Sequence, residues 1–76
     1  MALLDRITTD PNVLGGKPTI RKMRFSVAQL LELLAGGMSF EEILDDYPYL
    51  ELDDIRACLS YAALIANAGS IRKARA

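Results

Sequence analysis

The tripeptide Gly15-Gly16-Lys17 is the first feature of the sequence that could do chemistry, because glycines before a lysine are typical of phosphate-binding loops. A P-loop needs another glycine five residues before the last one, and a serine or threonine after the lysine to bind magnesium. Pro11 and Pro18 occupy those two positions here. The sequence therefore predicts a bend in a positively charged arm rather than a nucleotide pocket.

The remaining polar residues give little support to catalysis or metal binding. The chain has no histidine, which is the commonest general base and metal ligand. Cys58 is the single cysteine, and its apolar surroundings in the sequence predict an inert, packed thiol. Adjacent acids at 41–42, 45–46 and 53–54 are typical of solvated helix faces and of helix N-termini. We therefore expect no enzyme, no cofactor and no metal site.

The charged residues are segregated along the chain. Residues 1–24 hold five basic residues against two acids, a charge of +3, and residues 67–76 add three basic residues. Residues 25–66 hold one basic residue against eight acids, a charge of −7. Basic ends are where contacts to phosphate or to an acidic partner are expected, although Arg21 and Arg24 pairing with acids of the core is an equal alternative. The candidate contacts are Lys17, Arg21, Lys22, Arg24, Arg56, Arg72, Lys73 and Arg75.

Three helix starts are predicted by one repeated pattern. In this pattern an apolar residue precedes the N-cap, and a glutamate or glutamine occupies the third helical position. Residues 25–30 and 38–43 fit it fully, with Ser26 and Ser39 as N-caps. Residues 50–55 fit it less well, because a glutamate occupies the capping position.

Helix stops complete the predicted layout. Gly36-Gly37 ends the first helix, and Pro48 ends the second by excluding helical geometry from the residue before it. Two short helices, tight turns and a longer third helix outline a three-helix, helix-turn-helix core over residues 26–68. Residues 1–25 are expected to form a β-hairpin or irregular arm, with its second extended run at 18–25. The fold class is thus mainly α, in one domain, with a basic C-terminal tail over residues 69–76.

The third predicted helix is apolar nearly all round, which indicates burial on more than one side. Its inner stripe is expected to consist of Leu52, Ile55, Leu59, Ala62 and Ala66. Of the 76 residues, 51% are apolar, more than a domain of this size easily hides by itself. We therefore expect a homodimer with Tyr61, Leu64 and Ile65 between the subunits.

Two stretches of sequence carry a resemblance to a known family. One is Asp-Pro followed by Gly-Lys-Pro-Thr-Ile-Arg, and the other is GMSFEEILDDYPYLELDDIRACLSYA. With them, residues 6–63 resemble the bacterial domain-of-unknown-function family 433 (DUF433). The chain departs from the family at Lys22-Met23, where Gly-Thr is usual and glycine tolerates a tight turn that lysine resists. The family's signature arm corresponds to Gly16, Lys17, Pro18, Ile20, Arg21 and Arg24, and its turn and third-helix start to Asp46, Tyr47, Pro48, Asp54 and Ile55.

The resemblance implies a homeodomain-like helix-turn-helix domain that serves as antitoxin to a PIN-like ribonuclease toxin. We therefore expect a non-catalytic homodimer that binds such a toxin, with its own operator DNA as a further expected partner. Docking of the third helix in a DNA groove is disfavoured, because Glu51, Asp53 and Asp54 at its start repel phosphate. The alternative is a homodimeric protein-interaction module without nucleic-acid binding. No signal peptide or membrane-spanning run is recognised, so a cytoplasmic location without membrane contact is expected.

Overall fold

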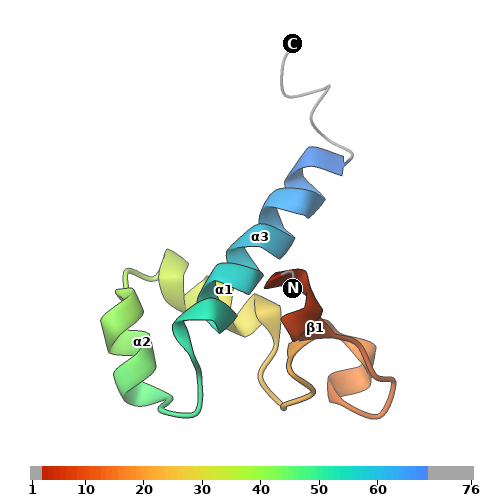
Figure 1. Cartoon of the computed structure of the whole chain (residues 1–76), viewed down its shortest axis with the longest axis horizontal. Helices are drawn as coiled ribbons and strands as arrows, with labels where there is room; N and C mark the ends of the chain where they lie inside the picture. Colours follow the sequence, from red (N-terminus) through yellow and green to blue (C-terminus); the bar gives the residue numbers. More distant parts are fainter. Residues whose placement is uncertain (1–2, 69–76) are drawn as a thin grey trace.

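The computed structural model describes residues 3–68 and shows three helices beside a small N-terminal β-segment (Figure 1). The mainly α fold and the N-terminal hairpin expected from the sequence are confirmed. Arg72, Lys73 and Arg75, and with them the predicted basic tail, lie outside the described residues. The elements in chain order are the 3-10 helix η1 (Leu3–Arg6), β1 (Ile7–Thr8), the 3-10 helix η2 (Leu14–Gly16), β2 (Thr19–Ile20), α1 (Val27–Ala35), α2 (Phe40–Asp46) and α3 (Leu52–Ala68).

The two strands are antiparallel, with Ile7 opposite Ile20 and Thr8 opposite Thr19. The hydroxyls of the two threonines lie 3.2 Å apart and link the strands on one face. Thr19 also forms a bridge with Ser26, so the chain doubles back after β2. The single extended run expected over residues 18–25 is therefore wrong, because a tight turn interrupts it.

This turn is made by Arg21 and Lys22, whose φ angles are both positive, at 46° and 62°. The Met23 N–H donates to the Ile20 carbonyl at 2.8 Å and closes the turn. Positive φ at both central residues is typical of a type I′ turn, and it costs a residue with a side chain about 1 kcal/mol. The Lys22 N–H donates to the Thr8 hydroxyl at 2.8 Å, which helps to hold the turn. The arm thus keeps a tight turn although lysine stands where the family usually has glycine.

The predicted helix ends are confirmed by hydrogen bonds at the caps. Ser26 accepts from the Gln29 N–H at 2.9 Å at the start of α1. At the start of α2 the capping box is complete, with Ser39 and Glu42 each accepting from the other's N–H, at 3.1 and 2.8 Å. After α1, the N–H groups of Gly37 (φ 102°) and the next residue donate to carbonyls of the last turn at 3.0 and 3.1 Å. This Schellman pattern lets the chain turn directly into α2.

The hydrophobic core lies where the three helices meet the N-terminal segment. The predicted inner stripe of α3 is confirmed at Ile55, which is fully buried. It is wrong at Leu52, which is 47% exposed, and at Leu59 and Ala66, which are exposed as well. The physical reason is that Asp54, next to Ile55, turns inward to meet two arginines. The buried apolar residues are Ile20, Phe25, Val27, Leu30, Ile43, Leu50, Ile55, Ala57 and Cys58.

The second half of α3 extends away from this core (Figure 1). Every residue from Ala63 to Ala68 is exposed, and the exposed fractions of Leu64 and Ile65 are 54% and 56%. Tyr61 is half-buried at the edge of the core. The expected second burial of α3 is therefore not provided by the described part of the chain. Within residues 3–68, no helix has the length and hydropathy needed to cross a membrane.

Candidate functional site

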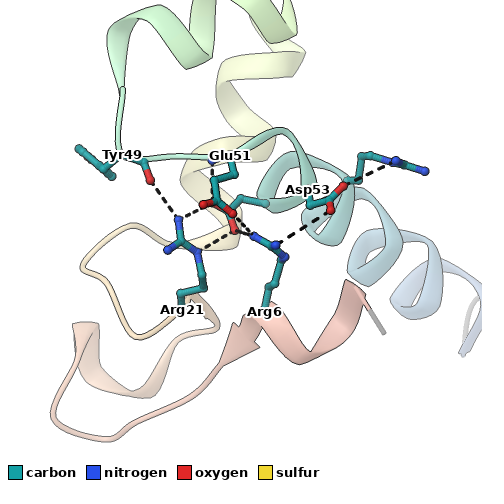
Figure 2. Close-up of polar contacts among 7 residues, drawn as sticks. Arg6, Arg21, Tyr49, Glu51 and Asp53 are labelled. Carbon is teal, nitrogen blue, oxygen red and sulfur yellow. Dashed lines mark hydrogen bonds and ion pairs between the residues drawn. The ribbon is translucent and has the colours of Figure 1, made fainter. Parts of the chain in front are cut away.

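A cluster of charged side chains joins the N-terminal segment to the start of α3. Figure 2 shows Arg6 and Arg21 reaching from that segment towards Glu51 and the first turn of α3. At its centre is Asp54, whose side chain is 0% exposed. Its carboxylate accepts from Arg21 Nε at 3.0 Å, Arg21 Nη2 at 2.7 Å and Arg6 Nη1 at 2.9 Å. The Glu51 backbone N–H donates a fourth hydrogen bond, at 2.8 Å.

The electrostatics of the cluster keep it ionised. Burial by itself raises the pKa of Asp54, but the hydrogen bonds from Arg21, the Glu51 backbone and Arg6 outweigh it and leave this pKa below its ordinary value. The pKa of Arg6 is raised by its hydrogen bonds to Glu51 and Asp54, and that of Arg21 by its hydrogen bonds to Asp54. A buried anion that is paired and hydrogen-bonded in this way holds the segments together. Removing one of its partners by substitution strongly lowers the free energy of unfolding.

Arg21 contacts two segments at once, because its Nη2 also donates to the Tyr49 carbonyl at 3.0 Å. Tyr49 lies in the loop between α2 and α3, so Arg21 fixes that loop as well as α3. The structure thus brings Arg21 to an acid of the helical core, which is the alternative that the sequence left open. Arg24 is exposed and forms no ion pair within residues 3–68.

From the sequence, the surroundings of Asp54 were predicted incorrectly and Arg6 was not identified. Asp54 was expected on a solvated helix face or at a helix N-terminus. It lies in the first turn of α3, but it is buried, because two guanidinium groups compensate its charge. Arg6 was not a candidate at all. A local signal for Asp54 exists, since it is the third residue of α3 and accepts from the N–H of Glu51, as capping-box acids do. No local signal identifies its arginine partners.

The other predicted basic contacts lie at the surface. Lys17, Lys22 and Arg24 are exposed and have no ion pair among the described residues 3–68. Arg56 is exposed on α3, with its Nη1 3.6 Å from a carboxylate oxygen of Asp53 one turn earlier. An exposed pair of this kind contributes little to stability and leaves the arginine accessible.

An apolar groove of about 450 Å³ separates the start of α1 from the second half of α3. Three of the described residues that line it have polar side-chain groups, namely Lys17, Ser26 and Tyr61. The Ser26 hydroxyl already caps α1. The apolar walls are formed by Pro18, Val27, Ala28 and Leu31 on one side and by Tyr61, Ala62, Ile65 and Ala66 on the other.

The groove contains two of the three residues expected between subunits, Tyr61 and Ile65. Leu64, the third, is exposed on the same helix. Apolar surface therefore continues from the groove onto the outside of α3. A continuous apolar surface of this kind marks a docking site more often than a site of chemistry.

Comparison with known proteins identifies the family. A match to the family described as "Protein of unknown function (DUF433)" extends over residues 7–62, from β1 into α3. The uncharacterized protein y4eO of Sinorhizobium fredii is 36% identical over 56 residues, which cover 74% of this chain and 25% of the relative. The chain thus spans about a quarter of that relative's length. No solved structure matches significantly. The matched region includes Arg21 and Asp54, and the chain belongs to the DUF433 family.

Proposed function

We propose that the chain is a non-catalytic docking module that binds another protein through the second half of α3 and the groove beside it. One observation carries this proposal: residues 57–68 contain no charged side chain, yet Leu64 and Ile65 on this stretch are more than half exposed. A surface helix normally carries charged residues on its solvent side. An uncharged and exposed helix segment beside an apolar groove is the kind of surface that a protein partner covers.

The non-catalytic part of the proposal is supported by the state of the reactive groups. Burial, with a smaller contribution from the charge of Asp54, raises the pKa of the Cys58 thiol to about 12. Little thiolate therefore exists at neutral pH, and the thiolate is the nucleophilic form. The buried carboxylate of Asp54 is occupied by two arginines, and the sequence offers no histidine as a base.

For the identity of the partner, we propose a PIN-like ribonuclease, with the chain acting as its antitoxin in the cytoplasm. The support is the family resemblance together with the docking surface. The matched region makes up 25% of the relative y4eO. In that relative the matched region is therefore joined to further sequence in one chain, as is expected of a module that binds other protein segments.

The test is co-purification from the host of tagged wild-type chain and of two variants. Ile65→Glu places a charge in the groove, whereas Leu52→Glu places it on an exposed leucine at the other end of α3, where the helix N-terminus favours an acid. We expect a partner to accompany wild type and Leu52→Glu, to be lost with Ile65→Glu, and to cleave RNA once freed. A partner retained equally by all three, or no partner, would contradict the proposal.

Binding of operator DNA is a second candidate function, favoured by Lys17, Lys22 and Arg24, which are exposed and form no ion pair within residues 3–68. It is weakened by the acids at the start of α3 and by the engagement of Arg21 with Asp54. Contacts from three basic side chains would give a log–log salt slope of about −2.7. A fluorescence titration of the chain with upstream promoter DNA tests this second candidate function. An absence of binding at low salt would exclude DNA binding and leave the protein-docking function.

A further inference from the structure

We propose that the groove is filled by α3 of a second copy, so that two copies pair about a twofold axis through the second halves of their α3 helices. This inference rests on the proposed docking function, and it places a second copy on the docking surface when the ribonuclease partner is absent. In a twofold pair each copy supplies both the groove and the helix that fills the other groove.

The lining of the groove argues against a small polar ligand. Sites for small molecules combine apolar walls with a few converging polar groups that fix the ligand. Among the described residues of this groove, Ser26 is used by the N-cap of α1, Lys17 is exposed, and the Tyr61 hydroxyl is the remaining polar side-chain group. The surface to be covered also continues beyond the groove to Leu64. A helix covers both parts at once, whereas a small molecule in the groove does not.

The chemistry of α3 itself matches what the groove requires. Over residues 57–68 the helix is uncharged, mostly apolar and rich in alanine, with Leu59, Leu64 and Ile65 as its large exposed apolar side chains. Small residues allow two helix axes to approach closely, and no charge is buried when two such helices meet. Twelve residues of helix extend about 18 Å, enough for a pair of helices to cross and cover each other's apolar side chains.

The distribution of charge favours pairing at this end of the molecule. Residues 25–66 carry a charge of −7, and all of their charged residues lie at or before Arg56. Two copies that met through α2 or the start of α3 would bring like charges together. Because the second half of α3 extends away from the core (Figure 1), pairing there leaves the acidic parts of the two copies apart.

The experiment is sedimentation equilibrium of the full chain across micromolar concentrations, with three variants. Ile65→Glu and Ala28→Glu charge the groove from its α3 and α1 walls, and both positions are exposed in the single chain, so folding is retained. We expect wild type to dimerise, and each groove variant to raise the dimer dissociation constant at least about 100-fold, because a charge would be buried between apolar walls. Leu52→Glu, on the same helix outside the groove, should leave the constant within about threefold.

A second readout identifies the occupant. In a mixture of isotope-labelled and unlabelled copies, filtered NOEs are expected between methyls of Val27 or Leu31 in one copy and Leu64 or Ile65 in the other. A wild-type monomer that still binds a protein partner through Ile65 would overturn the pairing and leave the docking function standing. A dimer that neither groove variant weakens would also overturn it. Loss of the protein partner by Leu52→Glu, a variant that should still dimerise, would count against the docking function alone.

Discussion

Replacing Asp54 with asparagine is the sharpest test of how this small fold is held together. The substitution keeps the size of the side chain and removes its charge. It leaves Arg6 and Arg21 facing a neutral amide, whose NH₂ group cannot accept from either guanidinium. It therefore separates the contribution of the ion pairs from that of packing.

The expected loss follows from the geometry of the cluster. Breaking a fully buried ion pair by removing one partner typically costs about 3–5 kcal/mol. Here the arginine side chains are 27% and 36% exposed, so water compensates part of the loss, and the amide oxygen of asparagine still accepts hydrogen bonds. We expect the free energy of unfolding to fall by about 2–3 kcal/mol, a large share of the stability of a domain this small.

Thermal unfolding followed by circular dichroism measures this loss. For a domain of this length, 2–3 kcal/mol lowers Tm by about 10–20 °C. Asp53→Asn is the matched control, because Asp53 is partly exposed and its nearest cationic nitrogens lie at 3.6 and 4.0 Å. That change should cost no more than about 0.5 kcal/mol. Equal melting temperatures for the two variants would refute the assignment of Asp54 as the centre of the cluster.

The same comparison has a defined pH dependence. The pKa of Asp54 is lower in the folded chain than in the unfolded chain. Its stabilisation is therefore fully present above the unfolded pKa, about 3.9, and is lost as the pH falls through the folded value. The difference in stability between wild type and Asp54→Asn should thus be constant near neutral pH and shrink below about pH 4. A difference that stays constant down to the lowest pH would show that the carboxylate charge is not responsible.

Three further predictions concern single residues. Ser39→Ala removes the cap of α2 and should lower the free energy of unfolding by about 1 kcal/mol in a urea titration, and an unchanged midpoint would contradict the role of the capping box. Lys22→Gly relieves the positive φ of the turn and should raise stability by about 0.5 kcal/mol, whereas a loss would show that the turn is not strained. Cys58, buried and with its pKa raised to about 12, should react with iodoacetamide only after denaturation, and rapid labelling of the native chain would show that the thiol is accessible.

The parts of the fold that the sequence predicted are those set by neighbours within a few residues. Ser26 and Ser39 cap the helices that follow them, and Gly37 ends α1, because each acts on backbone groups one turn away. The turn at Lys22 shows the limit of such reasoning. Its positive φ is held by a hydrogen bond to Thr8, 14 residues earlier, and lysine gives no local sign of it.

The phase of α3 and the arginine cluster were not predictable in this way. A helix that is apolar nearly all round has several possible inner faces, so periodicity alone did not show that Ala57 and Cys58, rather than Leu52 and Leu59, join Ile55 in the core. The choice is made by Asp54, whose partners Arg6 and Arg21 lie 48 and 33 residues away in sequence. For the docking surface the sequence predicted Tyr61, Leu64 and Ile65, but the α1 wall of the groove required the fold.

The central claim is that the second half of α3 is covered by another protein molecule when the chain is at work. Amide hydrogen exchange of the tagged chain, kept in the assembly in which it leaves the host cell, tests this most directly. We predict slow exchange over residues 59–68 in that assembly and fast exchange over the same residues in Ile65→Glu, with the rest of the chain alike. Fast exchange over this segment in both would contradict the account.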